Sequence, residues 1–307
     1  MVKAISVPQI DEEPVASVMR IMQLEELPGD SFRAASLPQV RRVYGGQVLA
    51  QGLLAAGATI DDDKRLPHSL HAYFLRGGDP FAPFDLQVTR MLDGRSFSNR
   101  HVAAFQDGRE LLSLNASFET PSKGVSFDVT GPNVIDPDSV KSALEIFRTT
   151  DHPVAKYLGK TAAFDMRHVQ GSLYTGADPE RRPYQQLWMR PRTTLPDGMS
   201  QLVHRALLAY AIDQVMLEPC LRATGLSWLT DGMSLASLDH AMWFHADVDI
   251  NEWLLVDGRA DAVGGARAKS HIRVFNQAGR LVASASQEGM VRVPEDGQQV
   301  SAHWGFQ

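Results

Sequence analysis

Two stretches of the chain are almost wholly apolar, and each precedes segments in which apolar and polar residues alternate. The apolar stretches are Gly45–Ile60, which carries no charged residue, and Ala206–Leu217. An apolar stretch of this length predicts a helix that is covered on most sides. Alternation, which is clearest at residues 281–286, predicts strands with one buried face. The pattern thus predicts two buried helices, each followed by strands.

Strand boundaries follow from the same alternation and from turn residues. In the first half the expected strands are Ser69–Leu75, Phe84–Leu92, Ser96–Gln106 and Arg109–Phe118. In the second half they are Ser234–His245, Trp253–Ala262, Gly265–Asn276 and Arg280–Arg292. Links that contain glycine, at Asp93-Gly94, Asp107-Gly108 and Ala278-Gly279, predict hairpin turns. Because short turns join consecutive strands, the pairing is expected to be antiparallel.

The two halves also resemble each other in sequence. Residues 101–113 are similar to residues 271–284, and residues 69–74 are similar to residues 237–244. One of the two apolar helices precedes each of these pairs. A curved antiparallel sheet wrapped round one buried helix satisfies this order of elements. The sequence therefore predicts an α+β protein built as two hotdog domains in tandem.

The domain boundaries are expected where the composition changes. We expect an N-terminal hotdog at residues 1–120 and a C-terminal hotdog at residues 185–307. Residues 121–184 are rich in proline, with one plausible helix at Ser139–Thr149. They are expected to form an interdomain linker with some ordered structure. The strand-like run that starts at Gln185 is expected to open the second sheet.

Composition and charge narrow the possible functions. The 307 residues are 44% hydrophobic and 21% charged, as expected for two globular domains. A net charge of −6 argues against a nucleic-acid partner. Cys220 is the single cysteine, which excludes an intrachain disulfide and fits a reducing compartment. Residues 1–11 show no signal peptide, residues 303–307 show no targeting address, and no apolar stretch is long enough to span a membrane, so we expect a cytoplasmic protein.

Several short motifs carry a specific likeness to a known family. They are residues 43–51, 68–76, 93–97, 237–245, 251–255 and 286–289. Together they resemble the acyl-CoA thioesterase II family, the TesB-like enzymes, over about Arg33 to Arg292. The resemblance implies a double hotdog that hydrolyses medium- to long-chain acyl-CoA without a metal or other cofactor. It also implies further association, so a homodimer or homotetramer is expected.

The resemblance also implies the active-site residues, which would all lie in the C-terminal half. The family has an Asp on the second helix, a Thr or Ser on the following strand and a Gln on the last strand. These positions fall on Asp213, Ser237 and Gln287. The position in the first half that corresponds to Gln287 is Ala116, which indicates one working site for each pair of domains.

The chemistry of the three residues agrees with these roles but does not require them. A carboxylate in an apolar helix is costly unless it is hydrogen-bonded or works as a base, so Asp213 fits a general base for water. The hydroxyl of Ser237 and the amide of Gln287 can hold that water or donate to a developing oxyanion. The alternatives are a structural Asp213, a structural strand Ser237 and a surface Gln287.

Other candidates have lower weight. The N–H groups of Gly45 and Gly46 can polarise a bound thioester carbonyl, which would make them substrate-binding residues, or the glycines can serve close packing. Because strand residues alternate, Asp239 is expected on the same face as Ser237, and His240 on the opposite face. No His or Cys cluster has the spacing of metal ligands.

Two functions compete with thioester hydrolysis. A hotdog enoyl-CoA hydratase would need a His/Asp pair that moves a proton at the acyl chain, and the resemblance places no such pair. A non-catalytic acyl-CoA-binding module would have no need of the three polar residues. Release of free thiol from a panel of acyl-CoA substrates separates the three possibilities.

Overall fold

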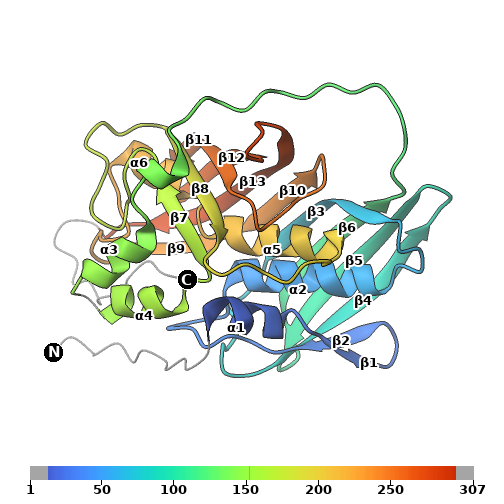
Figure 1. Cartoon of the computed structure of the whole chain (residues 1–307). Helices are drawn as coiled ribbons and strands as arrows, with labels where there is room; N and C mark the ends of the chain where they lie inside the picture. Colours follow the sequence, from blue (N-terminus) through green and yellow to red (C-terminus); the bar gives the residue numbers. More distant parts are fainter. Residues whose placement is uncertain (1–12, 152, 295–307) are drawn as a thin grey trace.

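The computed structural model describes residues 13–151 and 153–294. Its strands form one continuous sheet in which every pair is antiparallel (Figure 1). The sequence-based prediction for the two chain ends, at residues 1–11 and 303–307, lies outside the described residues. The strands are β1 (Glu25–Leu27), β2 (Ser31–Ala34), β3 (Leu66–Phe74), β4 (Phe84–Asp93), β5 (Phe97–Gln106), β6 (Arg109–Glu119), β7 (Phe164–His168), β8 (Tyr184–Pro191), β9 (Ser234–Ser237), β10 (Asp239–Phe244), β11 (Leu254–Gly264), β12 (Arg267–Phe275) and β13 (Leu281–Arg292).

The order of the strands has the symmetry of two joined sheets. The path is β1-β2-β4-β5-β6-β3 in the first half and β10-β13-β12-β11-β8-β7 in the second, with β9 paired to β13. β3 and β10 meet at the centre, where Leu70 lies opposite Met242 and Ala72 opposite His240. A two-fold relation between the halves therefore places Leu70 of the first half at the position that corresponds to His240 in the second half. The tandem double hotdog that the sequence predicts is confirmed.

Two helices lie on the inner side of the sheet, near the middle of the molecule (Figure 1). α2 (Gly45–Ala58) agrees closely with the predicted helix, whereas α5 (Gln201–Asp213) begins and ends earlier than predicted. α5 begins early because Ser200 caps it by accepting a hydrogen bond from the N–H of Val203. Gly57, near the end of α2, lies against Leu202 at the start of α5, so the helices run antiparallel.

The predicted turns are confirmed, and one further turn was missed. β4 and β5 are joined through Gly94, and Asp107 and Gly108 both have positive φ between β5 and β6, which suits a two-residue hairpin. Between β11 and β12, Gly265 and Ala266 also have positive φ. The prediction that Gly265 begins a strand is therefore wrong, because these two residues form the turn and β12 starts at Arg267.

The segment between the two halves runs as a long loop along the top of the molecule, from the first half to the second, and then folds (Figure 1). It forms a 3-10 turn (Pro137–Ser139), α3 (Ala143–Thr149), α4 (Pro153–Thr161) and β7. The predicted helix at Ser139–Thr149 is shorter than expected, because Ser142 caps α3. β7 pairs with β8 and extends the second half of the sheet. The boundaries proposed for the linker stay a prediction.

The remaining helices cover the edges of this core. α1 (Pro14–Ile21) packs beside α2 in the first half, and α6 (Glu218–Thr224) follows α5 after a short turn and packs on β8 and β11. The sequence did not predict α1, α4, α6, β1, β2 or β7 as elements. No helix in the described part of the chain has both the length and the apolar composition needed to cross a bilayer.

Candidate active site

The three residues selected from the sequence lie together in the structure. Asp213 is the last residue of α5, Ser237 is the last residue of β9, and Gln287 lies within β13. Ser237 Oγ lies 3.3 Å from Asp213 Oδ1, and Gln287 Nε2 donates to Ser237 Oγ at 2.9 Å. A carboxylate, a hydroxyl and a carboxamide from three separate elements therefore form one hydrogen-bonded group.

Close approach of the two central helices places the carboxylate. The N-terminus of α2 abuts the C-terminus of α5, and a Cβ at Gly46 would lie only 2.4 Å from the carbonyl oxygen of Tyr210. A Cβ at Gly45 would lie 3.0 Å from Asp213 Oδ2. Both positions therefore favour glycine for close packing, which was one of the two interpretations of Gly45 and Gly46. The substrate-binding role of these glycines stays a prediction.

The electrostatics of Asp213 suit a base that works near neutral pH. Its side chain is buried, and this desolvation raises the pKa of the carboxyl above that of an ordinary aspartate. A positive charge on His240, when that ring is protonated, the hydrogen bonds from Ser237 and Gln287, and the N–H of Gly46 oppose the rise but do not cancel it. Asp213 Oδ2 has no hydrogen-bond partner within the described residues, so it can accept one from a bound molecule.

His240 belongs to the same hydrogen-bonded group. The prediction that it lies on the opposite face from Ser237 is therefore wrong. Its Nδ1 lies 2.6 Å from Gln287 Oε1, and its ring is buried. Ser237 pairs with Gly289, whereas Ala241 pairs with Ser286, so the β9–β10 segment contains one residue more than β13.

The extra residue is Leu238, which lies between β9 and β10 and forms a β-bulge. The bulge shifts the alternation by one residue, so His240 shares the inner face with Ser237. The predicted position of Asp239 is wrong for the same reason. Asp239 instead accepts a hydrogen bond from the N–H of Glu288 at 2.7 Å. A bulge without glycine leaves no strong signal in the sequence.

An apolar cavity opens onto Asp213, Ser237 and Gln287. It has a volume of about 1320 Å³ including its mouth. Much of its wall comes from the segment between the two halves, including Ala143, Phe147, Tyr157, Leu158, Phe164 and Met166. The rest comes from α1, the loop before α2, α5 and the turn after it, β9, the residues after α6, and β13. The polar group therefore lies in a pocket suited to an apolar chain.

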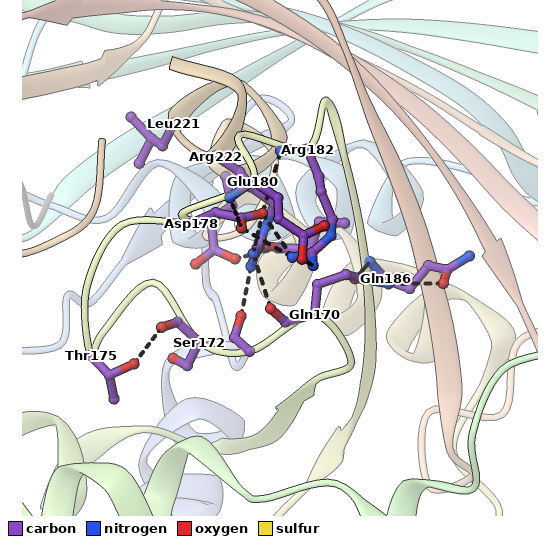
Figure 2. A network of polar contacts seen from close by, with 12 residues as sticks. Gln170, Ser172, Thr175, Asp178, Glu180, Arg182, Gln186, Leu221 and Arg222 are labelled. Atoms are coloured by element: carbon purple, nitrogen blue, oxygen red, sulfur yellow. Dashed lines mark hydrogen bonds and ion pairs between the residues drawn. The ribbon is translucent and has the colours of Figure 1, made fainter. Parts of the chain in front are cut away.

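Buried polar networks hold one side of this wall. Figure 2 shows Arg222 and Asp178 at the centre of one of them. Arg222 Nη1 lies 3.1 Å from Asp178 Oδ2, and Arg222 Nη2 donates to the carbonyl of Gly171 at 2.6 Å. Asp178 also pairs with Arg182 at 3.0 Å. These contacts fasten the loop before β8 onto α6, and this loop carries Tyr174, a wall residue.

A second network, around Glu218, supports the wall directly. Glu218 accepts from Trp228 Nε1 at 2.7 Å, lies 2.9 Å from His168 Nε2, and also accepts from Gln185 Nε2. Burial by itself would raise the pKa of Glu218, but the charge of His168 and these hydrogen bonds outweigh it and lower the pKa. Trp228 lines the cavity and stacks with Tyr174. Nothing in the sequence marks these residues as part of a cavity wall.

Fold and site together define a double-hotdog protein with a polar group at the end of an apolar pocket. Residues 33–119 match the family model of the acyl-CoA thioesterase N-terminal domain, and residues 137–291 match that of the C-terminal domain. The chain belongs to the acyl-CoA thioesterase family. The second match begins within the segment interpreted as a linker, which agrees with the pairing of β7 and β8.

Individual relatives extend over nearly the whole chain. The chain is 30% identical to "Acyl-CoA thioesterase 2" of Haemophilus influenzae, over 91% of this chain and 98% of the relative. It is 31% identical to human "Acyl-coenzyme A thioesterase 8", over 90% of this chain and 89% of the relative. The crystal structure of acyl-CoA thioesterase II TesB2 from Mycobacterium marinum superposes with a TM-score of 0.74 at 33% identity, over 92% of this chain and 100% of that chain.

Proposed function

We propose that this protein hydrolyses acyl-CoA thioesters with a water molecule activated by Asp213 and held by Ser237 and Gln287. Membership of the acyl-CoA thioesterase family supports the reaction. The observation that carries the site assignment is the convergence of these three side chains at the end of an apolar cavity. Carboxylate, hydroxyl and carboxamide groups suffice to bind and deprotonate water.

The reaction follows from the direction of the hydrogen bonds. In the charged form of Asp213, the Ser237 hydroxyl donates to the carboxylate and accepts from Gln287. Water donates one proton to Asp213 and the other to Ser237, which leaves an oxygen lone pair directed at the thioester carbon. As the C–O bond forms, Asp213 takes the first proton. The C–S bond then breaks, the thiolate of CoA takes the proton from Asp213, and the fatty acid remains.

The acyl group is proposed to occupy the apolar cavity. Each methylene that leaves water contributes about 0.8 kcal/mol, so a long chain gains much binding energy from such a wall. The apolar lining therefore supports medium- to long-chain substrates. The N–H of Gly46 favours the charged form of Asp213, and we keep polarisation of the thioester carbonyl by the start of α2 as a further part of the proposal.

A panel of acyl-CoA substrates tests the proposal. We expect release of free thiol, detected with a thiol reagent, to rise from short to medium and long chains. A second candidate is hydration of enoyl-CoA, because the site holds both a carboxyl and an imidazole, those of Asp213 and His240, and the charge of each affects the pKa of the other. That reaction would give a 3-hydroxyacyl-CoA without free thiol. Binding without any product would indicate a non-catalytic module.

Compartment, pathway and assembly complete the proposal. We place the protein in the cytoplasm and in fatty acid metabolism, on the basis of its single cysteine and of the acyl-CoA names of its relatives. We also propose a homodimer or homotetramer and no metal requirement. Hydrolysis should accordingly survive treatment with a chelator, and a loss of activity that one specific metal restores would contradict the last point.

A further inference from the structure

His240 lies in the hydrogen-bonded group but has no part in the reaction as written above. Its ring is buried, and burial lowers its pKa although the charge of Asp213 opposes this, so at neutral pH the favoured form is the neutral imidazole with one N–H. Its Nδ1 lies 2.6 Å from Gln287 Oε1. Its Nε2 has no hydrogen-bond partner within the described residues. Because buried polar atoms are usually hydrogen-bonded, a buried histidine with only one partner is unusual and indicates a functional role.

The ring nitrogen of His240 that carries the proton can be deduced from Asp213, the acceptor at the other end of the hydrogen-bonded group. The ionised carboxylate of Asp213 can only accept, so the single hydroxyl proton of Ser237 is directed to it. Ser237 Oγ must then accept from the Nε2 of Gln287, which turns Oε1 of that carboxamide towards His240. Because Oε1 can only accept, the proton of His240 lies on Nδ1.

The first half of the chain offers an internal comparison. The extra residue in β3, His68, lies between Pro67 and Ser69, where the register with β6 shifts just as it does at Leu238. Position by position, the first half has Pro67 for Ser237, Leu70 for His240 and Ala116 for Gln287.

Leu70 and Ala116 are fully buried in the apolar core. The fold therefore accepts an apolar side chain at the position equivalent to His240. The imidazole occurs only in the half that has the other polar residues. This co-occurrence favours a role in the site rather than in the fold.

We propose that His240 is a positioning residue, whose Nδ1–H holds the carboxamide of Gln287 in the one orientation that donates to Ser237. Without this donor only Ser237 and Asp213 hold the carboxamide, which can then rotate by half a turn and present Oε1 to Ser237. The Ser237 hydroxyl then donates to Gln287 instead of Asp213, and the water-binding arrangement is lost. The inference rests on the proposed hydrolysis, but the protonation state of His240 can be measured without any substrate.

Two substitutions separate positioning from other roles. His240→Leu reproduces the residue of the first half and removes the donor. His240→Asn keeps an N–H close to the position of Nδ1 and has no equivalent of Nε2. We expect the Leu variant to lose about 10-fold to 100-fold in kcat, with KM changed only a few-fold, as is usual when a catalytic group is slightly misplaced. The Asn variant should recover most of this loss.

A double-mutant cycle shows whether His240 acts through Gln287. In a Gln287→Ala background the His240→Leu change should have little further effect on kcat. His71→Leu, which alters an exposed histidine on the outer face of β3, is the matched control and should leave kcat unchanged. Losses that multiply in the double variant, an Asn variant as inactive as a folded Leu variant, or a Leu variant with wild-type kcat would overturn the proposal.

A measurement on the substrate-free protein decides the tautomer. Two-bond nitrogen–proton correlation spectra of ring-labelled histidine should show His240 as a neutral ring protonated at Nδ1, and Gln287→Ala should shift its nitrogen signals. A ring protonated at Nε2 would overturn the inference even if thiol release is normal. A Nδ1–H ring in a protein that hydrolyses no thioester would keep the geometry and refute the proposed reaction instead. This arm also remains decisive if the Leu variant fails to fold.

Discussion

At the scale of single residues, the proposed reaction depends on the buried carboxylate of Asp213. Burial raises its pKa, so the fold favours the protonated form. Its contribution to stability is therefore complete below the pKa of the unfolded chain and is lost as pH rises through the higher folded pKa. The charged base thus destabilises the protein at neutral pH. A neutral asparagine there should fold at least as stably as the native aspartate.

The same shift predicts how activity depends on pH. Only the charged form of Asp213 accepts a proton, so kcat should fall as pH drops through its raised pKa. This acid limb should lie above the pH of about 3.9 that an ordinary aspartate would give. Ser237→Ala removes a hydrogen bond that lowers the pKa, so in that variant the limb should move to higher pH. Tyr44 and His240 also surround the carboxyl of Asp213. A pH profile of kcat that shows no acid limb down to a pH of about 4 would contradict the prediction.

Ser237 separates water activation from covalent catalysis. Ser237→Thr keeps the hydroxyl and should retain much of the activity, whereas Ser237→Ala should lose a substantial part. Ser237 Oγ contacts the carboxylate of Asp213 and accepts from the carboxamide of Gln287, an arrangement that suits a hydroxyl that holds water. We therefore expect neither a burst of CoA release nor a covalent adduct. Rapid mixing followed by mass spectrometry checks this, and an acyl group on the peptide that contains Ser237 would refute it.

At the scale of elements, the cavity wall depends on the network around Glu218. Its lowered folded pKa means that the carboxylate contributes stability above the pKa of the unfolded chain, and that this contribution is lost as pH falls through the folded pKa. At pH 7, Glu218→Gln leaves His168 without its charged partner and weakens the hold on Trp228. We expect a loss of about 3 kcal/mol in the free energy of unfolding, the usual scale for breaking a buried pair.

Activity should report the same change in the wall. KM for long acyl chains should rise more than kcat falls, because the base itself is untouched. Glu180→Gln, at an exposed ion pair with Arg182, is the control, with an expected change below about 0.5 kcal/mol. Chemical denaturation and substrate saturation curves measure both effects. Equal stability of the two variants would show that Glu218 does not brace the wall.

How far the sequence predicts these elements depends on the signals available. Hairpins with Asp-Gly turns, such as Asp107-Gly108, were predicted because glycine tolerates positive φ. The turn at Gly265-Ala266 was missed because alanine rarely adopts that conformation. The bulge at Leu238 has no sequence signal, and this led to the wrong face for His240. The short strand β7 was missed because it lies in a segment rich in proline.

The residues of the site also divide into those that could be predicted from the sequence and those that could not. Asp213, Ser237 and Gln287 could be chosen because the family resemblance placed them, and the structure brings them together. Periodicity alone left each with a structural alternative. The wall residues could not be predicted, since Phe147 or Trp228 in a sequence looks like any other core residue. Their role depends on contacts between segments far apart in the chain.

At the scale of the whole molecule, one sheet carries two related halves but a single polar site. The end strands β1 and β7 leave two edges, and the outer face of the sheet exposes Tyr73 and Trp243 at its centre. Association of copies would cover such surfaces. We therefore expect a dimer or tetramer in solution. Light scattering coupled to gel filtration measures this, and a mass near 33.8 kDa at micromolar concentration would contradict it.

The central claim is that Asp213 deprotonates the water that cleaves an acyl-CoA thioester. The most direct test is the rate of free thiol release by the wild-type protein and by Asp213→Asn, both with a medium- or long-chain acyl-CoA at saturation. Thermal denaturation should show that the variant is folded and no less stable. We expect rapid release by the wild type and a loss of about 10² or more in kcat for the variant, the scale of a general base. A folded variant whose turnover stays within a few-fold of the wild type would contradict it.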